Sequence, residues 1–169
     1  MATIVETPRL RLRDWAPSDG ERFFAIHGDA RVHRFTGSEP LANVEAARAR
    51  LARTIEMNAT RGHGHWALVE REGEELVGNC GFRPAERDGE LEIGFIIAPD
   101  RWRLGYATEI VDACARLGFD RFGLRRIVSL TDPDNLAARR VLEKVSFTRV
   151  ADETHDERTW AVYERRRSE

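Results

Sequence analysis

Apolar and polar residues alternate near the start of the chain. Within residues 5–15, Leu10 and Leu12 are separated by arginines, which is the period-2 pattern of a β-strand with one buried face. The interleaved arginines then share the opposite face of the strand. We therefore expect the chain to begin with a single strand that is apolar on one side and basic on the other.

Helical patterns come next. The spacing Ser18-x-x-Glu21 is that of a capping box, so a helix is predicted to begin there and to end at Gly28. A second short turn is expected over residues 30–35. Over residues 43–60, apolar positions recur at helical spacing among Arg and Glu, which predicts an amphipathic surface helix. These segments precede the main sheet.

Two hairpins are predicted in the middle of the chain. Residues 66–70 and 76–83 are rich in strand formers and are separated by a polar, glycine-containing turn. Asp88-Gly89 is a stronger turn signal, because both residues tolerate the positive φ of a tight hairpin turn. A third strand, Glu90–Ala98, should follow antiparallel and end before Pro99.

The remaining segments alternate between helix and strand. Residues 105–121 carry a helical apolar stripe, and residues 124–131 again look like a strand, which should be parallel to the previous one because a helix separates them. A helix is predicted after the turn Asp132–Asn135. Two closing strands, 147–151 and 159–164, are then expected around a polar turn over residues 152–157.

The order of elements predicts the fold class. It indicates one α/β domain over residues 1–169, with a single mixed, mostly antiparallel sheet of about seven strands and about four helices. No internal repeat, linker or low-complexity tract interrupts that order.

Composition excludes several classes of protein. The chain has 27 basic and 29 acidic residues, so it carries no overall positive field that would hold a nucleic-acid backbone. No apolar run approaches the roughly 18 residues that cross a bilayer, and residues 1–6 lack an export signal. We therefore expect a cytoplasmic protein without a nucleic-acid or membrane partner.

Cysteine and histidine spacing argues against a metal site. Cys80 and Cys114 are the only cysteines, and neither has Cys or His neighbours at ligand spacing. His63 and His65 flank a glycine, but two imidazoles without a third ligand make a poor metal site. We expect no metal and no disulfide framework.

The most informative segment is residues 96–108, where a strand runs through a short loop into a helix. Unpaired backbone N–H groups and the positive end of the helix dipole should meet there and favour an anion. Gly105 and Ala107 are small residues that would let a phosphate reach the amides. The Walker and dinucleotide-binding patterns are both absent. An ordinary strand–loop–helix connection is the alternative interpretation.

The sequence resembles the GNAT superfamily of acyl-CoA N-acyltransferases, and within it the RimJ/RimL-type branch. Four segments carry this resemblance in the family's order: residues 7–13, 92–95, 102–109 and 135–147. The family's Arg/Gln-x-x-Gly-x-Gly/Ala signature corresponds to residues 102–107, with Trp102 where Arg or Gln is general.

The resemblance implies a GNAT-like fold with two parallel, splayed central strands and acetyl-CoA as co-substrate. Backbone groups of the third hairpin strand would pair with the pantetheine arm, amides of the following loop would bind the pyrophosphate, and an Asn at a helix start would touch the arm. The implied cofactor-binding residues are Phe95, Ile96, Ile97, Trp102, Arg103, Leu104, Gly105, Tyr106, Ala107, Thr108 and Asn135. For Asn135, a simple N-cap is an equally natural role.

The implied reaction is transfer of the acetyl group to a primary amine by direct attack in a ternary complex, because no nucleophile motif is present. The backbone N–H near Phe95 would polarise the carbonyl. Glu92 is the candidate general base, since burial would help it to accept a proton; a solvated carboxylate is the alternative. His33, Phe35 and His65 are candidates for substrate binding, and a histidine is an alternative base.

Two positions depart from the family pattern. Ala138 replaces the Ser that often protonates the leaving thiolate, and Ser146 replaces a Gly whose αL conformation ends a helix. The loss at Ala138 keeps a non-catalytic CoA-binding regulatory module as the alternative function. The acceptor is open between a protein or peptide N-terminus and a small-molecule amine, and a homodimer stays open as well.

Overall fold

One β-sheet organises the chain. The computed structural model describes residues 1–85 and 89–169, and within them eight strands pair in the order β1-β2-β3-β4-β5-β6-β8-β7. The strands are β1 (Thr3–Glu6), β2 (Leu10–Arg13), β3 (His65–Glu70), β4 (Leu76–Pro84), β5 (Leu91–Ile97), β6 (Arg126–Thr131), β7 (Thr148–His155) and β8 (Arg158–Arg166). The helices are α1 (Gly20–His27), α2 (Ala30–His33), α3 (Val44–Arg61), α4 (Tyr106–Arg121) and α5 (Leu136–Lys144), with 3₁₀ turns η1 (Pro17–Asp19) and η2 (Pro99–Arg101).

The centre of the sheet contains a parallel pair, β5 and β6, which separates after a short ladder. Only Leu91 with Ile127 and Glu92 with Val128 are paired between these strands. Helix α4 connects the two strands, as a parallel pair requires. All other neighbouring strands that the structure describes are antiparallel. The predicted α/β class, mixed sheet and splayed central strands are therefore confirmed.

The sheet has one strand more than predicted, because the expected strand over residues 5–15 is a hairpin. Leu10 and Leu12 are fully buried, so the alternation was interpreted correctly. However, the backbone N–H of Thr7 donates to the Leu10 carbonyl over 2.9 Å, and the chain turns at Pro8. Strands β1 and β2 then pair antiparallel on either side of this turn.

The capping box predicted at Ser18 and Glu21 for the start of α1 is wrong. Ser18 does not cap the helix; the chain enters through η1, and the Asp19 carboxylate accepts from the Ala16 N–H over 2.8 Å. Arg13 holds the same carboxylate by two bonds of 2.9 and 2.8 Å. Asp19 is the N-cap residue of α1 but makes no side-chain cap either, because its carboxylate is bound to Arg13 and the Ala16 N–H.

The closing hairpin is longer than predicted. The polar segment over residues 152–157 was expected to be a turn, but β7 continues to His155 and β8 begins at Arg158. The turn is reduced to Asp156 and Glu157, with φ of 49° and 64°. Positive φ at both central residues matches the right-handed twist of a two-residue hairpin.

The predicted turn at Asp88-Gly89 falls between β4 and β5, but Asp88 lies outside the described residues.

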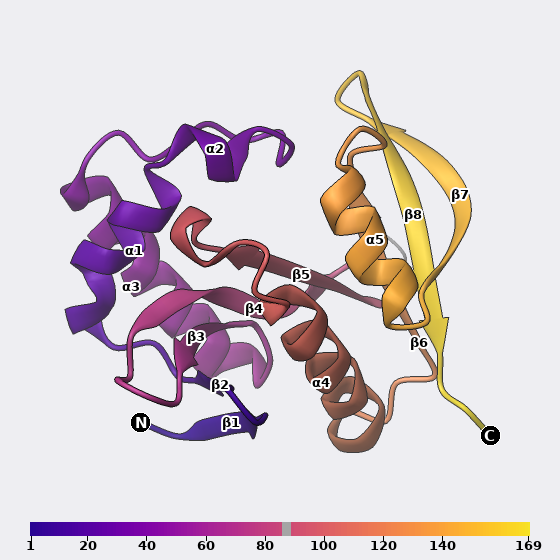
Figure 1. Cartoon of the computed structure of the whole chain (residues 1–169), viewed down its shortest axis with the longest axis horizontal. Coiled ribbons are helices and arrows are strands. Elements are labelled where there is room, and N and C mark those ends of the chain that lie inside the picture. The colour runs from indigo at the N-terminus through magenta and orange to yellow at the C-terminus, as the bar shows by residue number, and fades with distance from the viewer. Residues whose placement is uncertain (86–88) are drawn as a thin grey trace.

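Helices pack on both faces of the sheet (Figure 1). Figure 1 shows α1 and α3 beside the β2–β4 part of the sheet, α2 beyond α1, and α5 beside β8. On β5, Ile93 packs in one buried cluster with Ile110 of α4, whereas Ile96 packs with the cluster that contains Leu51 of α3. Because side chains alternate along a strand, Glu92 and Gly94 share the α3-facing side with Ile96.

Candidate functional site

The loop after η2 has an unusual backbone. Arg103 has a φ of 65° and Gly105 a φ of 79°, so both lie in the left-handed region. Gly105 is the N-cap of α4, a 16-residue helix, and has no side chain to cap it. Among the described residues, no acceptor pairs with the backbone N–H groups of residues 103–108; the first bond runs from Glu109 to Gly105 over 3.1 Å. Unpaired donors and a helix dipole therefore converge here.

Residues of the turn between β1 and β2 form hydrogen bonds with the loop at 103–108 and the start of α4. The Arg9 guanidinium donates to the Leu104 carbonyl over 2.7 Å and to Glu109 over 2.7 Å. Thr7 donates to Glu109 over 2.6 Å. The carbonyl of Leu104 is thus occupied from outside the loop, and its neighbouring N–H groups remain available.

A second set of contacts ties the loop to the sheet. The Trp102 indole donates to the Ile97 carbonyl at the end of β5 over 2.7 Å. The Tyr106 hydroxyl and the Arg101 guanidinium each donate to Glu70 of β3 over 2.8 Å. These bonds, first of all that from Arg101, hold the pKa of Glu70 below its ordinary value. The predicted cofactor residues at 95–97 and 102–108 are therefore brought together at one end of β5.

The splayed part of β5 presents backbone groups toward β6. The Ser129 hydroxyl on β6 donates to the Ile93 carbonyl over 3.0 Å, so the backbone groups of Ile93 point toward β6. The direction of these groups alternates along a strand, and those of Phe95 therefore point the same way. Because the ladder between the strands ends at Glu92, the Phe95 groups have no ladder partner on β6.

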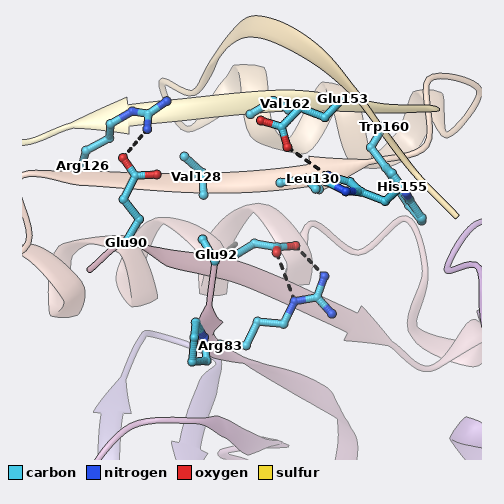
Figure 2. Close-up of a pocket in the computed structure, with 12 residues that line it drawn as sticks. Arg83, Glu90, Glu92, Arg126, Val128, Leu130, Glu153, His155, Trp160 and Val162 are labelled. Carbon is cyan, nitrogen blue, oxygen red and sulfur yellow. Dashed lines mark hydrogen bonds and ion pairs between the residues drawn. The ribbon is translucent and has the colours of Figure 1, made fainter. Parts of the chain in front are cut away.

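Glu92 lies in a cavity of about 350 Å³ on the side of the sheet away from α4 (Figure 2). Its side chain is 9% exposed and accepts two hydrogen bonds from Arg83, of 2.7 and 3.1 Å. Both carboxylate oxygens are thus held by one guanidinium.

Strands β6, β7 and β8 form the rest of the cavity wall. Arg126 forms ion pairs with Glu90 and Glu164. Glu153 lies 3.0 Å from His155, and Trp160 adds an aromatic surface to the wall (Figure 2). None of these residues was predicted from the sequence. In the sequence they are only acidic and basic residues on different predicted strands. The pairing that brings them together joins strands far apart in sequence, so no local pattern indicates it.

The predicted histidines lie on the same side of the sheet as Glu92. Asn79 of β4 lies between His65 and His27: its Oδ1 is 3.2 Å from His65 Nδ1 and its Nδ2 is 2.9 Å from His27 Nε2. Burial lowers the pKa of His65 to about 4 and that of His27 to about 3. The ring of His33 lies 5.9 Å from that of His27, and burial lowers the pKa of His33 as well.

The other predicted residues make contacts of their own. Phe35 lies under the Arg34 guanidinium at 5.0 Å. Asn135 caps α5 by accepting from the Ala138 N–H over 3.2 Å, so its predicted N-cap role is confirmed. It follows β6 as the loop at 102–108 follows β5, and the ends of parallel strands share one edge of a sheet. Ser146 has a φ of 67°, the αL conformation expected at that position.

The described residues lack two features that would point to other functions. Within residues 1–85 and 89–169, no group of three or more His, Cys, Asp or Glu side chains is arranged to hold a metal ion. None of the helices in the described part of the chain is long and apolar enough to span a membrane.

Sequence comparison identifies relatives of the chain. A family model described as an acetyltransferase (GNAT) domain matches residues 9–148. The uncharacterized N-acetyltransferase YoaA of Bacillus subtilis (strain 168) is 33% identical over 148 residues, covering 87% of this chain and 84% of YoaA.

Solved structures share the fold. An acetyltransferase (GNAT family) from Bacillus anthracis matches with a TM-score of 0.82 at 22% identity, covering 96% of each chain. RimL, a ribosomal L7/L12 alpha-N-protein acetyltransferase solved with coenzyme A, matches with a TM-score of 0.83 at 19% identity, covering 98% of each chain. At these identities the likeness concerns the fold.

Proposed function

The chain belongs to the GNAT acetyltransferase family, and we propose that residues 1–169 form one N-acetyltransferase domain that uses acetyl-CoA to acetylate a primary amine. The acyltransferase class itself follows from the family. The observation that carries the proposal is the row of unpaired N–H groups over residues 103–108 at the start of α4. Such donors at a helix N-terminus bind anions, and the diphosphate of acetyl-CoA is an anion of this kind.

We place acetyl-CoA along the part of β5 that does not pair with β6. The pantetheine arm would lie along Phe95, Ile96 and Ile97, whose strand makes no ladder with β6 there. The diphosphate would lie on the loop from Trp102 to Thr108, and the amide of Asn135 would reach the arm from α5. The fit is supported by Gly105, because its φ of 79° and its missing side chain keep the amides accessible.

Direct attack by the amine is the mechanism that these residues favour. Cys80 and Cys114 are fully buried, so neither thiol is accessible for a covalent intermediate. The amine nitrogen would bond to the thioester carbon while the N–H of Phe95 stabilises the developing oxyanion. The carbon–sulfur bond then breaks, and coenzyme A leaves as the thiolate.

The acceptor is proposed to enter from the side of the sheet that carries Glu92. The cavity beside Glu92 offers carboxylates, guanidinium groups and the Trp160 ring, and His33 at the end of α2 lies beside His27 on that side, with Phe35 two residues further along the chain. A RimJ/RimL-like peptide or protein N-terminus and a small-molecule amine are both compatible with such a mixed surface. Glu92 remains the hypothesis for the base that was drawn from the sequence.

A panel of amines tests the proposal. The protein would be incubated with acetyl-CoA and an alanyl peptide, a seryl peptide, spermidine, an amino acid or an aminoglycoside, and the products weighed by mass spectrometry. We expect a gain of one acetyl group on at least one amine. Calorimetry should detect acetyl-CoA binding to the natural protein and none to Gly105→Trp. Absence of acetyl-CoA binding to the natural protein would overturn the proposal.

A further inference from the structure

The ring of His65 lies across two glycines. Pairing between the strands places His65 opposite Gly81, and Gly81 opposite Gly94. A Cβ atom at Gly94 would lie only 2.9 Å from Cε1 and 3.4 Å from Nε2 of His65. The absence of side chains on both neighbours therefore lets the imidazole extend across β4 to β5. It ends beside the residue that precedes Phe95, where the acyl carbonyl is proposed to lie.

Asn79 determines which nitrogen of His65 carries the proton. The amide Nδ2 of Asn79 can only donate, and it lies 2.9 Å from His27 Nε2, which therefore accepts. The amide Oδ1 can only accept, so His65 Nδ1, 3.2 Å away, must carry a proton. A neutral imidazole carries one proton, and Nε2 of His65 is left with an unshared electron pair.

The surroundings keep this imidazole neutral. Burial, together with the charges of Arg83 and Arg50, holds the pKa of His65 at about 4, despite the opposing hydrogen bond to Asn79. The carboxylate of Glu92, by contrast, has both oxygens bound to Arg83. Of these two groups beside Gly94, His65 is the one whose acceptor atom is not used by another side chain.

We propose that His65 Nε2 accepts the proton of the acceptor amine, and that Asn79 and His27 are positioning residues that maintain the required tautomer. The inference rests on the proposed acetyl transfer. As the carbon–nitrogen bond forms, the nitrogen becomes positively charged and transfers its proton to Nε2. The carbon–sulfur bond breaks, the thiolate is protonated by solvent, and the imidazolium returns its proton to water. No group is oxidised or reduced in this sequence.

Two measurements on the full chain test the inference. With histidine labelled in ¹⁵N, NMR at neutral pH should show that His65 is protonated on Nδ1 and not on Nε2, with its signals assigned from His65→Gln. In acetylation of the best amine of the panel, His65→Gln should lower kcat at least tenfold while leaving acetyl-CoA affinity unchanged. His63→Gln is the matched control, because His63 packs against Phe122 instead, with ring centroids 6.4 Å apart.

Asn79→Leu provides the test of the positioning role. It should increase the Nε2-protonated form of His65 and lower kcat, while the KM for acetyl-CoA stays unchanged. A proton on Nε2 in the natural protein, or equal kcat for His65→Gln and the natural protein, would overturn the inference alone. If the natural protein binds acetyl-CoA and acetylates none of the amines, the proposed function fails, whatever the variants do.

Discussion

Arg9 and Glu109 are separated by 100 residues in sequence and are joined by the Arg9 backbone N–H over 3.0 Å and by Nε over 2.7 Å. Burial alone would raise the pKa of Glu109, but the bonds from Thr7 and Arg9 outweigh it and hold the pKa below its ordinary value. The same guanidinium lies 4.8 Å from the centre of the Tyr106 ring. The first hairpin of the chain therefore supports the start of α4.

Replacing Arg9 should weaken cofactor binding. In Arg9→Ala, the Leu104 carbonyl and Glu109 lose their charged donor, and the loop at 103–108 becomes less well ordered. We expect the Kd for acetyl-CoA to rise about tenfold, which corresponds to about 1.4 kcal/mol. Arg11→Ala is the control, because Arg11 pairs with Glu6 and Glu74 and does not contact the loop. Equal Kd values for the two variants, measured by calorimetry, would contradict the prediction.

Alanine substitutions of the glycines at the two ends of α4 distinguish the effect of backbone strain from the effect on ligand binding. Gly105 and Gly123 have φ of 79° and 64°, so an alanine at either position costs about 1–2 kcal/mol of stability. Only Gly105 borders the unpaired N–H groups. Both variants should show a similar drop in urea midpoint, and only Gly105→Ala should lose acetyl-CoA affinity. Reduced affinity in Gly123→Ala would show that strain alone explains the effect.

Glu92→Gln tests the base that the sequence suggested. Because Arg83 occupies both carboxylate oxygens, we expect the change to lower kcat only a few-fold and to leave the KM for acetyl-CoA unaltered. Glu90→Gln, which disturbs the Arg126 pair in the same cavity, is a matched control. A fall in kcat of about a hundredfold, specific to Glu92→Gln, would instead identify Glu92 as the base.

The buried histidines should make stability depend on pH. Burial lowers the pKa of His27 to about 3 and that of His65 to about 4, from an ordinary value of 6.5. As pH falls below about 6.5 the unfolded chain takes up protons first, so the folded state loses stability until the pH reaches the folded pKa values. We expect a loss of about 1–2 kcal/mol between pH 6.5 and 5.5.

Urea unfolding at a series of pH values measures this loss. The carboxyl groups of Glu70, Glu109 and Glu164 have pKa values below 4.5 in the folded chain, so their contribution is lost only in more acidic solution. His65→Gln should flatten the dependence between pH 6.5 and 5.5. A midpoint that stays constant over this range in the natural protein would refute the prediction.

The fold was largely predictable, because the apolar periodicity is local. Leu10 and Leu12 marked a buried strand face, and the helical stripe ending near Arg121 marked α4. The turn at Pro8 was missed because the alternation around Leu10 and Leu12 was extended back to Val5, although Glu6 and Thr7 interrupt it. The extension of β7 to His155 was missed because β7 is an edge strand exposed along most of its length, so residues 152–155 are polar like those of a turn.

The candidate site was only partly predictable. The loop at 102–108 could be identified because its signal is a continuous segment. The partners that hold it, Arg9 and Glu70, come from distant strands, and no local pattern points to them. The two-sided role of Asn79 likewise depends on His27 and His65 meeting on either side of it, which only the folded sheet determines.

The exposed indole of Trp102 is an intrinsic fluorophore at the proposed cofactor loop. Trp102 is 46% exposed, whereas Trp15 and Trp66 are 6% and 3% exposed. Its ring is fixed to the end of β5 through the Ile97 carbonyl and borders the unpaired N–H groups. Occupation of that loop by a diphosphate would change the polarity around this one ring far more than around the two buried ones. Emission from the unmodified chain should therefore follow cofactor binding without any attached dye.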